Sequence, residues 1–487
     1  MQFQFDNSYA RDLDGLYLRV LPTRVAAPQL IRFNHLLATE LGLDCDGTND
    51  AELANLFSGN VIAEGAEPLA MAYAGHQFGH FSPQLGDGRA ILLGEATDRH
   101  GIRRDIQLKG SGRTPFSRGG DGRSALGPVL REYIVSEAMH ALGIPATRGL
   151  AAVLTGEEVY RESTVPGGVF TRVAASHIRV GTFQFFAARG DFASVKRLAD
   201  YAIQRHYPAA AMADRPALAF LEMVADHQAA LIAKWLAVGF VHGVMNTDNC
   251  TISGETIDFG PCAFMDHYDP HALFSSIDRD GRYASSNQAN IALWNLARLA
   301  ETLVPLIDVD QEQAVDLANK VLSAFPAKFE TARMGEMRRK LGLVSKRQED
   351  AKLIADLLDQ MQLQIVDYTV AFRKLSLCEV GEVSFVELFA NTNLIRDWVI
   401  KWQQRLSVEG RDQTVIRAEM LLSNPAYIPR NHRIEEVIRA ATDHGDFAPF
   451  HRLVGVLVRP FDDQPENSQY AVPPREDQRV TKTFCGT

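Results

Sequence analysis

Hydrophobic residues follow two periodicities along the chain, and the change from one to the other divides it. Between residues 66 and 190 glycine is dense, and short apolar runs such as AILLGEA, DIQLKG and GLAAVLT alternate with turn signals. This pattern is typical of strands joined by tight turns. After about residue 190, apolar side chains recur three or four residues apart, as on amphipathic helices. We therefore predict a mostly antiparallel sheet followed by a mainly helical region.

The same periodicity places individual helices. The best defined covers 126–142, with Pro128 near its first turn, Gly143 at its end and Pro145 just beyond, as expected of helix termini. An amphipathic helix is predicted at 29–41, before Gly42. Further helices are predicted at 195–206, 216–237, 289–303, 311–325, 348–375 and 394–407, and a β hairpin at 250–259 interrupts them.

These elements suggest an order of parts along the chain. We predict an N-terminal helical and extended segment at 1–65, a sheet-rich part at 66–190, a helical part at 191–461 and a polar, proline-bearing extended tail at 462–487. A sheet-rich part followed by a helical part, with a small hairpin at the join, is the outline of a protein kinase. The predicted fold class is α+β, with a sheet-rich N-lobe and a mainly helical C-lobe.

Composition and charge narrow the functional classes. Of the 487 residues, 46% are hydrophobic and 23% charged, and the net charge is −10. That charge repels nucleic acid and anionic membranes. The longest apolar stretch, 229–245, is interrupted by Lys234 and His242 and falls short of a membrane span. The N-terminus has no signal-peptide pattern and the five cysteines form no CxxC pair, so we expect a cytoplasmic protein that binds neither nucleic acid nor membrane.

A glycine turn is the first candidate for phosphate binding. In Leu85-Gly86-Asp87-Gly88-Arg89, two glycines would let backbone N–H groups approach phosphate oxygens, and the arginine adds positive charge. Because Ile91 occupies the place of the third glycine of the kinase pattern, a plain hairpin turn is the alternative interpretation.

Lys109 ends the alternating segment DIQLKG, where a kinase-type fold places the lysine that binds ATP phosphates. A surface lysine is the alternative. The next helix supplies Glu132 and Glu137, either of which could pair with Lys109. We favour Glu132, because it is nearer the helix start.

Further arginines could contact anions. The loop 111–123 carries Arg113, Arg118 and Arg123 among four glycines, which suits an anion-binding loop. Arg172 and Arg179 are seven residues apart. On a helix they would share one face and could bracket a triphosphate, although an exposed basic face is the more common outcome.

The strongest motif is His-Gly-Val-Met-Asn-Thr-Asp-Asn at 242–249, followed by Ile-Asp-Phe-Gly at 257–260. In kinases, an Asn after the catalytic loop and the Asp of Asp-Phe-Gly supply oxygen ligands to magnesium. Asn249 and Asp258 occupy these places. Val244 stands where the usual base would be and cannot accept a proton, so Asp248 is the nearest replacement carboxylate.

The chain resembles the selenoprotein O family, also called the YdiU family, over nearly its whole length. The marks of the resemblance are YAGHQFG at 73–79, LGDGR at 85–89, QLKGSGRTPFSR at 107–118, HGVMNTDN at 242–249 and CGT at 485–487. The resemblance implies a kinase-like fold that binds ATP flipped relative to kinases, so that AMP passes to Ser, Thr or Tyr hydroxyls of protein partners.

The resemblance also implies a role for each candidate residue. Asp248 would accept the proton, with Lys109 and its partner Glu132 as further catalytic residues, and Asn249 and Asp258 would bind magnesium, or manganese in its place. The implied nucleotide contacts are Gly86, Gly88, Arg89, Lys109, Asp121, Gly122, Arg172, Arg179 and Asp258. The oligomeric state is open, with a monomer favoured. Cys485 would be a redox handle on the tail, with Cys262 as one candidate disulfide partner.

Two other functions stay open at this point. A small-molecule or protein phosphotransferase would transfer the γ-phosphate, but Val244 argues against it. A non-catalytic pseudokinase would bind ATP without turnover, against which Lys109, Asn249 and Asp258 argue.

Overall fold

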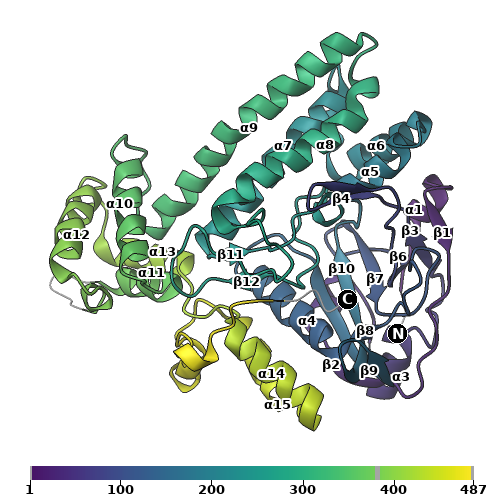
Figure 1. Ribbon diagram of the computed structural model, residues 1–487, viewed down its shortest axis with the longest axis horizontal. Helices are drawn as coiled ribbons and strands as arrows, with labels where there is room; N and C mark the ends of the chain where they lie inside the picture. Colours follow the sequence, from purple (N-terminus) through teal and green to yellow (C-terminus); the bar gives the residue numbers. More distant parts are fainter. Residues whose placement is uncertain (1–2, 46, 379–383, 484–487) are drawn as a thin grey trace.

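The computed structural model describes residues 3–45, 47–378 and 384–483. Its largest sheet is antiparallel, with the strand order β1-β3-β6-β7-β10-β9-β2, and β8 pairs with β10 (Figure 1). The strands of this sheet are β1 (Tyr17–Arg19), β2 (Gln29–Phe33), β3 (Leu69–Met71), β6 (Ala90–Thr97), β7 (Arg103–Lys109), β8 (Ser124–Ala125), β9 (Arg148–Tyr160) and β10 (Thr164–Ala174). Two short pairs complete the strands: β4 (Gly75–Gln77) with β5 (His80–Ser82), and β11 (Phe240–Val241) with β12 (Ala263–Phe264).

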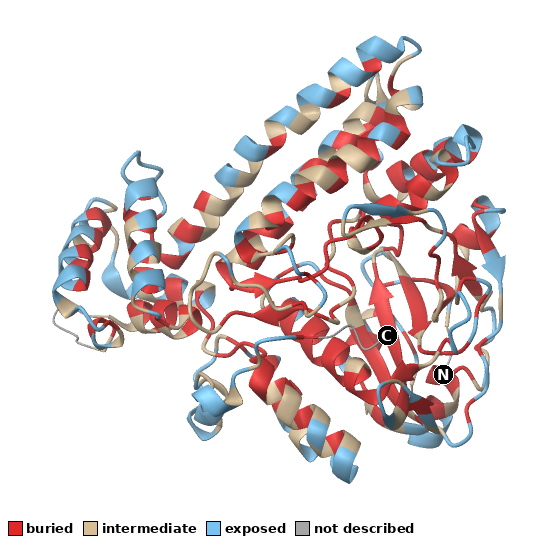
Figure 2. Ribbon diagram, in the orientation of Figure 1, coloured by how far each residue is buried: buried red, intermediate tan, exposed pale blue. Residues whose placement is uncertain are grey.

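Both faces of the large sheet are covered, which explains why its central strands are nearly continuous apolar runs. Leu92 and Ala152 belong to the core that includes α4 (Leu126–Ala141), whereas their neighbours Leu93 and Val153 belong to the core that includes α3 (Asp50–Phe57). Successive side chains of a strand point to opposite faces, so each strand contributes to both cores. Figure 2 shows these strands buried along most of their length.

The remainder of the chain is mainly helical. The helices α7, α8 and α9 pack against one another and lie side by side in Figure 1. The C-terminal end of α9 and the helices α10–α13 enclose a separate apolar core. The helices not yet given are α1 (Ser8–Asp12), α2 (His35–Glu40), α5 (Val180–Ala187), α6 (Phe192–His206), α7 (Pro216–Ala237), α8 (Gln288–Ile307), α9 (Gln311–Lys340), α10 (Asp350–Leu363), α11 (Tyr368–Leu377), α12 (Thr392–Ser407), α13 (Gln413–Ser423), α14 (Asn431–His444) and α15 (Ala448–Leu457). Within the described part of the chain, no helix could cross a membrane.

Most predicted elements are confirmed, including the antiparallel sheet, the helix at 126–142 and the helix at 216–237. The single helix predicted at 29–41 is wrong. Its first residues form β2, paired with β9, and Asn34 then caps the short helix α2 by accepting a hydrogen bond from the Leu37 N–H. Strand pairing to a distant segment has overridden local periodicity here.

Two further predictions need correction. The helix predicted at 348–375 is two helices, because Ile365 has a φ of 55° and Asp367 starts α11 as its N-cap. The predicted β hairpin at 250–259 has no ladder of its own: Thr251 bridges to Arg179 and Thr256 to Ala146. This segment therefore pairs with the start of α5 and with the connection between α4 and β9 instead of pairing with itself.

The predicted extended tail is only partly extended. It contains two short 3-10 turns at Pro465–Tyr470 and Glu476–Gln478. Near its end, Thr483 bridges to Ser275, and its hydroxyl donates to the Pro261 carbonyl at 2.5 Å. Cys485, predicted to be a redox handle, lies outside the described residues.

The core around α11 contains a lysine. Lys340, the last residue of α9, is only 3% exposed, and its ammonium lies 4.1 Å from the Phe372 ring centroid and 5.2 Å from that of Tyr368. Burial lowers the pKa of Lys340 to about 7. The aromatic faces offset part of the cost of burying the charged form.

We therefore predict that Lys340→Met stabilises the protein. Since the pKa of Lys340 is lower in the folded state than in the unfolded chain, the unfolded state holds more protons between about pH 7 and pH 10. Lys340 therefore destabilises the folded state most below pH 7, and this destabilisation decreases as pH rises. At pH 6 the variant should gain about 1–4 kcal/mol, measured by denaturant unfolding.

Lys401→Met is the matched control, because Lys401 is an exposed lysine on α12. It should change stability little at any pH. A loss of stability in Lys340→Met at pH 6 would show that the contacts of the ammonium with the rings outweigh its burial.

Candidate active site

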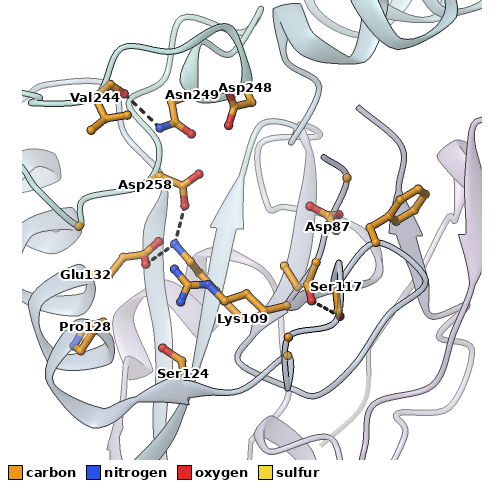
Figure 3. Close-up of a pocket in the computed structure, with 18 of the residues that line it drawn as sticks. Asp87, Lys109, Ser117, Ser124, Pro128, Glu132, Val244, Asp248, Asn249 and Asp258 are labelled. Carbon is orange, nitrogen blue, oxygen red and sulfur yellow. Dashed lines mark hydrogen bonds and ion pairs between the residues drawn. The ribbon is translucent and has the colours of Figure 1, made fainter. Parts of the chain in front are cut away.

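The predicted site residues gather around a cleft of about 610 Å³. Its walls come from the turn before β6, the end of β7, α4, β10 and the segment after α7 (Figure 3). Residues far apart in sequence thus face one space. The predicted residues that line it are Gly86, Gly88, Arg89, Lys109, Asp121, Gly122, Glu132, Arg172, Arg179, Asp248, Asn249 and Asp258, together with Arg118, Arg123 and Val244.

Lys109 lies between two carboxylates. Its Nζ is 2.6 Å from Glu132 Oε2 and 2.5 Å from Asp258 Oδ1 (Figure 3). Glu137 is not part of this cluster, because it pairs with Arg148 at 2.8 Å. Of the two glutamates on α4, it is therefore Glu132 that holds Lys109 toward the cleft.

The two arginines predicted to share a helix face do not lie on one helix. Arg172 is in β10, and Arg179 is the N-cap residue of α5. They nevertheless converge on one carboxylate: Arg172 Nη1 is 2.8 Å from Asp258 Oδ1 and Arg179 Nη1 is 3.6 Å from Asp258 Oδ2. The chain turns between β10 and α5, which the seven-residue spacing alone did not reveal.

This clustering of charge governs the protonation of Asp258. Burial alone would raise its pKa, but Lys109, Arg172 and Arg179 hold the pKa of Asp258 well below its ordinary value. The carboxylate is therefore ionised across the physiological range. Arg179 Nη2 is buried without a hydrogen-bond partner and lies 3.6 Å from Asp87 Oδ1, so Arg179 links the carboxylates of Asp87 and Asp258.

The backbone of Asp258 is also unusual. Its φ is 63°, in the left-handed region that costs a non-glycine residue about 1 kcal/mol or more. Neighbouring contacts hold this conformation: Phe259 is fully buried, and the His242 ring, Nε2 to carbonyl, is 2.9 Å from the Ile257 oxygen. Burial lowers the pKa of His242, so the ring is a neutral support of the loop.

Asn249 and Asp258 offer oxygen atoms suited to a hard divalent cation. Asn249 donates its amide N–H to the Val244 carbonyl at 3.1 Å, which fixes the amide and leaves its oxygen for the cleft (Figure 3). Asp258 Oδ2 has only the distant Arg179 contact. The described residues contain no group of three or more His, Cys, Asp or Glu side chains that could hold a metal. The donor set fits Mg²⁺, which commonly takes one or two protein ligands with phosphate and water oxygens completing its shell.

Asp248 lies beside this pair. Asp248 as a whole residue is 8% exposed, and Oδ2 is 3.3 Å from the amide nitrogen of Gln77, whereas Oδ1 is buried without a hydrogen-bond partner. Burial raises the pKa of Asp248 to about 6, and the nearby Arg179 opposes part of that shift. An acid with this pKa and an unpartnered oxygen is suited to accept a proton near neutral pH.

The glycine turn works differently from the prediction. The N–H groups of Gly86 and Gly88 donate to the carbonyls of Tyr73 and Gly86, so they are not available to phosphate. A Cβ on Gly86 would lie 2.2 Å from the Phe116 ring, and one on Gly88 would lie 2.9 Å from the Phe116 carbonyl. The glycines are needed because the loop after β7 packs directly onto this turn.

The cationic loop at 111–123 is only partly directed at the cleft. Arg118 lines it, whereas Arg113 does not. Arg123 donates to the carbonyls of Thr23 and Arg24. Asp121 forms a bidentate ion pair with Arg161, with N–O distances of 2.8 and 3.1 Å. Arg123 and Asp121 are therefore held by other parts of the protein.

Sequence reasoning missed several residues of the site. Asp87 is buried and accepts from the side chain of Gln107, whose oxygen in turn accepts from Arg172 at 2.7 Å. Tyr73 lies under Arg179, with the guanidinium 4.3 Å from its ring centroid. Asp87 and Tyr73 lie within motifs identified in the sequence. The position of Asp87 between two glycines could have indicated a buried acid. Arg161 stands alone in a turn and carried no signal.

Comparison with known proteins gives one consistent family. Residues 1–458 match the family model described as "Protein adenylyltransferase SelO". The chain is similar to "Protein nucleotidyltransferase YdiU" of Rhizobium etli (strain CIAT 652), at 58% identity over 100% of this chain and 97% of the relative. Proteins of the same description from Bradyrhizobium sp. (strain ORS 278) and Rhodopseudomonas palustris (strain BisB5) are also 58% identical, each over the full length of both chains.

The position of Asp248 yields a test. A Cβ on Gly75 would lie 2.5 Å from Asp248 Oδ1 and 2.9 Å from a Leu85 methyl carbon, so Gly75→Ala must displace the carboxylate. We expect nucleotide transfer to fall at least about tenfold, because a displacement of this size misaligns a reacting group. Nucleotide affinity, measured by calorimetry, should stay within about twofold.

Gly335→Ala is the control, because a Cβ on Gly335 in α9 would meet nothing within 4 Å. It should leave transfer unchanged. Unchanged transfer in Gly75→Ala would mean that the carboxylate of Asp248 does not need its present position.

Proposed function

The chain belongs to the SelO family of protein adenylyltransferases, and from that premise we propose that it transfers AMP from ATP to Ser, Thr or Tyr hydroxyls of proteins. The observation that carries the proposal is the convergence of Lys109, Arg172 and Arg179 on Asp258, beside Asp248. Val244 occupies the place of the usual kinase base. This supports a reaction at a phosphorus other than the γ-phosphorus, with ATP bound flipped relative to kinases.

The proposal assigns the residues as follows. The acceptor hydroxyl attacks the α-phosphorus, the bond from this phosphorus to the bridging oxygen of the β-phosphate breaks, and pyrophosphate leaves. Asp248 takes the hydroxyl proton at its unpartnered oxygen. Lys109, Arg172 and Arg179 bind the phosphate oxygens and stabilise the charge that develops on them, and Glu132 keeps Lys109 in position.

The remaining cleft residues would bind or enclose the nucleotide. Arg89 contributes charge to the wall, while Gly86, Gly88, Asp121 and Gly122 shape it. Asn249 and Asp258 would hold magnesium, or manganese in its place. When bound, the cation would supply Lewis-acid stabilisation of phosphate charge.

We also propose a kinase-like, two-lobed arrangement with the cleft between the lobes. The sheet-rich part at 66–190 would be the N-lobe and the part at 191–461 the C-lobe, with 462–487 as a tail. The segment 1–65 would be an extension of the N-lobe, since β1 and β2 pair with its strands. We expect a cytoplasmic enzyme that acts as a monomer.

Isotopic labelling tests the reaction. The purified protein is incubated with magnesium, a protein acceptor and ATP labelled at either the α- or the γ-phosphate. Label should pass to protein from α-labelled ATP alone, and Asp248→Asn should lower the rate by about 10²–10⁴-fold while ATP still binds. Transfer from γ-labelled ATP alone would restore a kinase, and tight ATP binding without any transfer would favour a pseudokinase.

Removal of divalent cations provides a separate test. With excess EDTA, label transfer should fall to background and return on addition of magnesium, because a site with two protein oxygens binds the cation too weakly to compete with the chelator. Asp258→Asn should require a much higher magnesium concentration for half-maximal transfer. Undiminished transfer in EDTA would exclude the proposed metal role.

A further inference from the structure

The β4–β5 hairpin, which carries His76, Gln77 and Phe78, is fastened to the loop that contains Asp248. The His76 N–H donates to Thr247 Oγ1 at 2.7 Å, and the Phe78 N–H donates to Asn246 Oδ1 at 3.1 Å. The Gln77 amide reaches the Asp248 carboxylate itself. Gln77 and Phe78 also line the cleft. A molecule lying on this hairpin is therefore held next to the proposed base.

Two side chains of the hairpin, His76 and Phe81, form a group with three side chains that follow later in the sequence. We call this group the hairpin face: His76, Phe81, Arg282, Trp294 and Arg298. Phe81 is 41% exposed, and the His76 ring lies 4.9 Å from it and 5.1 Å from Trp294, centroid to centroid. The guanidinium carbons of Arg282 and Arg298 lie 4.7 and 5.0 Å from the centroid of the Trp294 ring. Stacked arginines have fixed orientations and keep their N–H edges available.

The hairpin face carries positive charge that the protein neutralises only in part. Arg298 pairs with Glu301 at 2.6 Å, but no carboxylate among the described residues is within ion-pairing distance of Arg282. Asp278, four residues earlier, accepts from the backbone N–H groups of Arg282 and Tyr283. The Nε of Arg282 is buried without a hydrogen-bond partner.

Other charges lie near the hairpin face. Arg279 and Asp280 are both exposed on the same loop as Arg282. Burial, followed by the charges of Arg298 and Arg282, lowers the pKa of His76, while its hydrogen bond with Gln184 opposes the shift. The charges that act on the His76 ring are those of Arg298 and Arg282, so the field at this ring is positive in a chain whose net charge is −10. A cationic spot against an acidic background favours anionic partners locally.

We propose that the hairpin face docks the acceptor protein, and that it selects hydroxyl groups with an acidic residue nearby in the acceptor sequence. The proposal rests on the transfer reaction proposed above. An acidic side chain of the acceptor would pair with Arg282, its apolar neighbours would contact Phe81 and Trp294, and the hydroxyl would enter the cleft past Gln77. Single-stranded nucleic acid also suits arginine and aromatic side chains, but the charge of the whole chain opposes it.

A charge-swap experiment tests the docking surface. Peptides with one Ser or one Tyr are compared, identical except that the flanking positions carry Glu, Ala or Lys, and AMP transfer from α-labelled ATP is followed for each. For the unaltered enzyme we expect a KM about three- to tenfold lower for Glu-flanked than for Lys-flanked peptides. In Arg282→Glu with Arg298→Glu, the preference should reverse while the KM for ATP is unchanged.

The controls separate docking from folding and from the reaction itself. A reversed preference is a gain for Lys-flanked peptides, which a misfolded variant cannot produce. Arg452 is an exposed arginine on α15. The variant Arg452→Glu changes the net charge by the same amount as either single substitution and should keep the original preference. Arg282→Lys should retain most of the preference, because it keeps the charge.

Each remaining outcome has a defined meaning. Label transfer with equal KM for all flanks, or an unchanged preference in the double variant, would overturn the docking proposal and leave the transfer reaction standing. Absence of label in every peptide and in the enzyme itself would overturn the transfer reaction, and the docking proposal with it. Competition by oligo(dT) that is lost in the double variant, without any peptide preference, would assign the face to nucleic acid instead.

Discussion

The Asp258 carboxylate is the point on which the cleft depends. Three cations from three different elements reach it: Lys109 from the end of β7, Arg172 from β10 and Arg179 from the start of α5. Each is costly to bury alone, and the carboxylate is costly to bury without them. Because their positions satisfy one another, the sheet and the segment after α7 are locked in one relative arrangement. All three cations line the cleft, where their positive charge would attract phosphate oxygens.

Close backbone approach is the second constraint on the site. The chain at Gly75 touches the Asp248 side chain, and the chain at Gly86 touches the Phe116 ring. In both places glycine is required because another group packs closely against its backbone, and not because its N–H binds a ligand. Backbone N–H groups in the turn before β6 are already used inside the protein, so anion binding falls to side chains. Charged side chains can also move more readily than a turn.

Local sequence patterns predicted those features of the fold that depend on residues close together in the chain. The ends of α4 and the position of Lys109 follow from periodicity, proline and glycine placement, and alternation. Contacts across the sheet had no such signal. Pairing of β2 with β9 converted the start of a predicted helix into a strand, and the turn after β10 brought Arg179 to Arg172 without a shared helix. Asp87 and Gln107 belong to the site only through their chain of hydrogen bonds to Arg172, which exists only once the strands have paired.

The order of strands has a consequence for how the chain must fold. Both outermost strands of the large sheet, β1 and β2, come from the first 33 residues, whereas their partners are β3 and the much later β9. During synthesis these first residues must wait until Leu154 has been added before both strands can pair fully. Loss of the N-terminal segment would uncover both borders of the sheet at once, and unpaired strand borders invite association between chains. A segment that contributes no described residue to the lining of the cleft thus protects the solubility of the part that does.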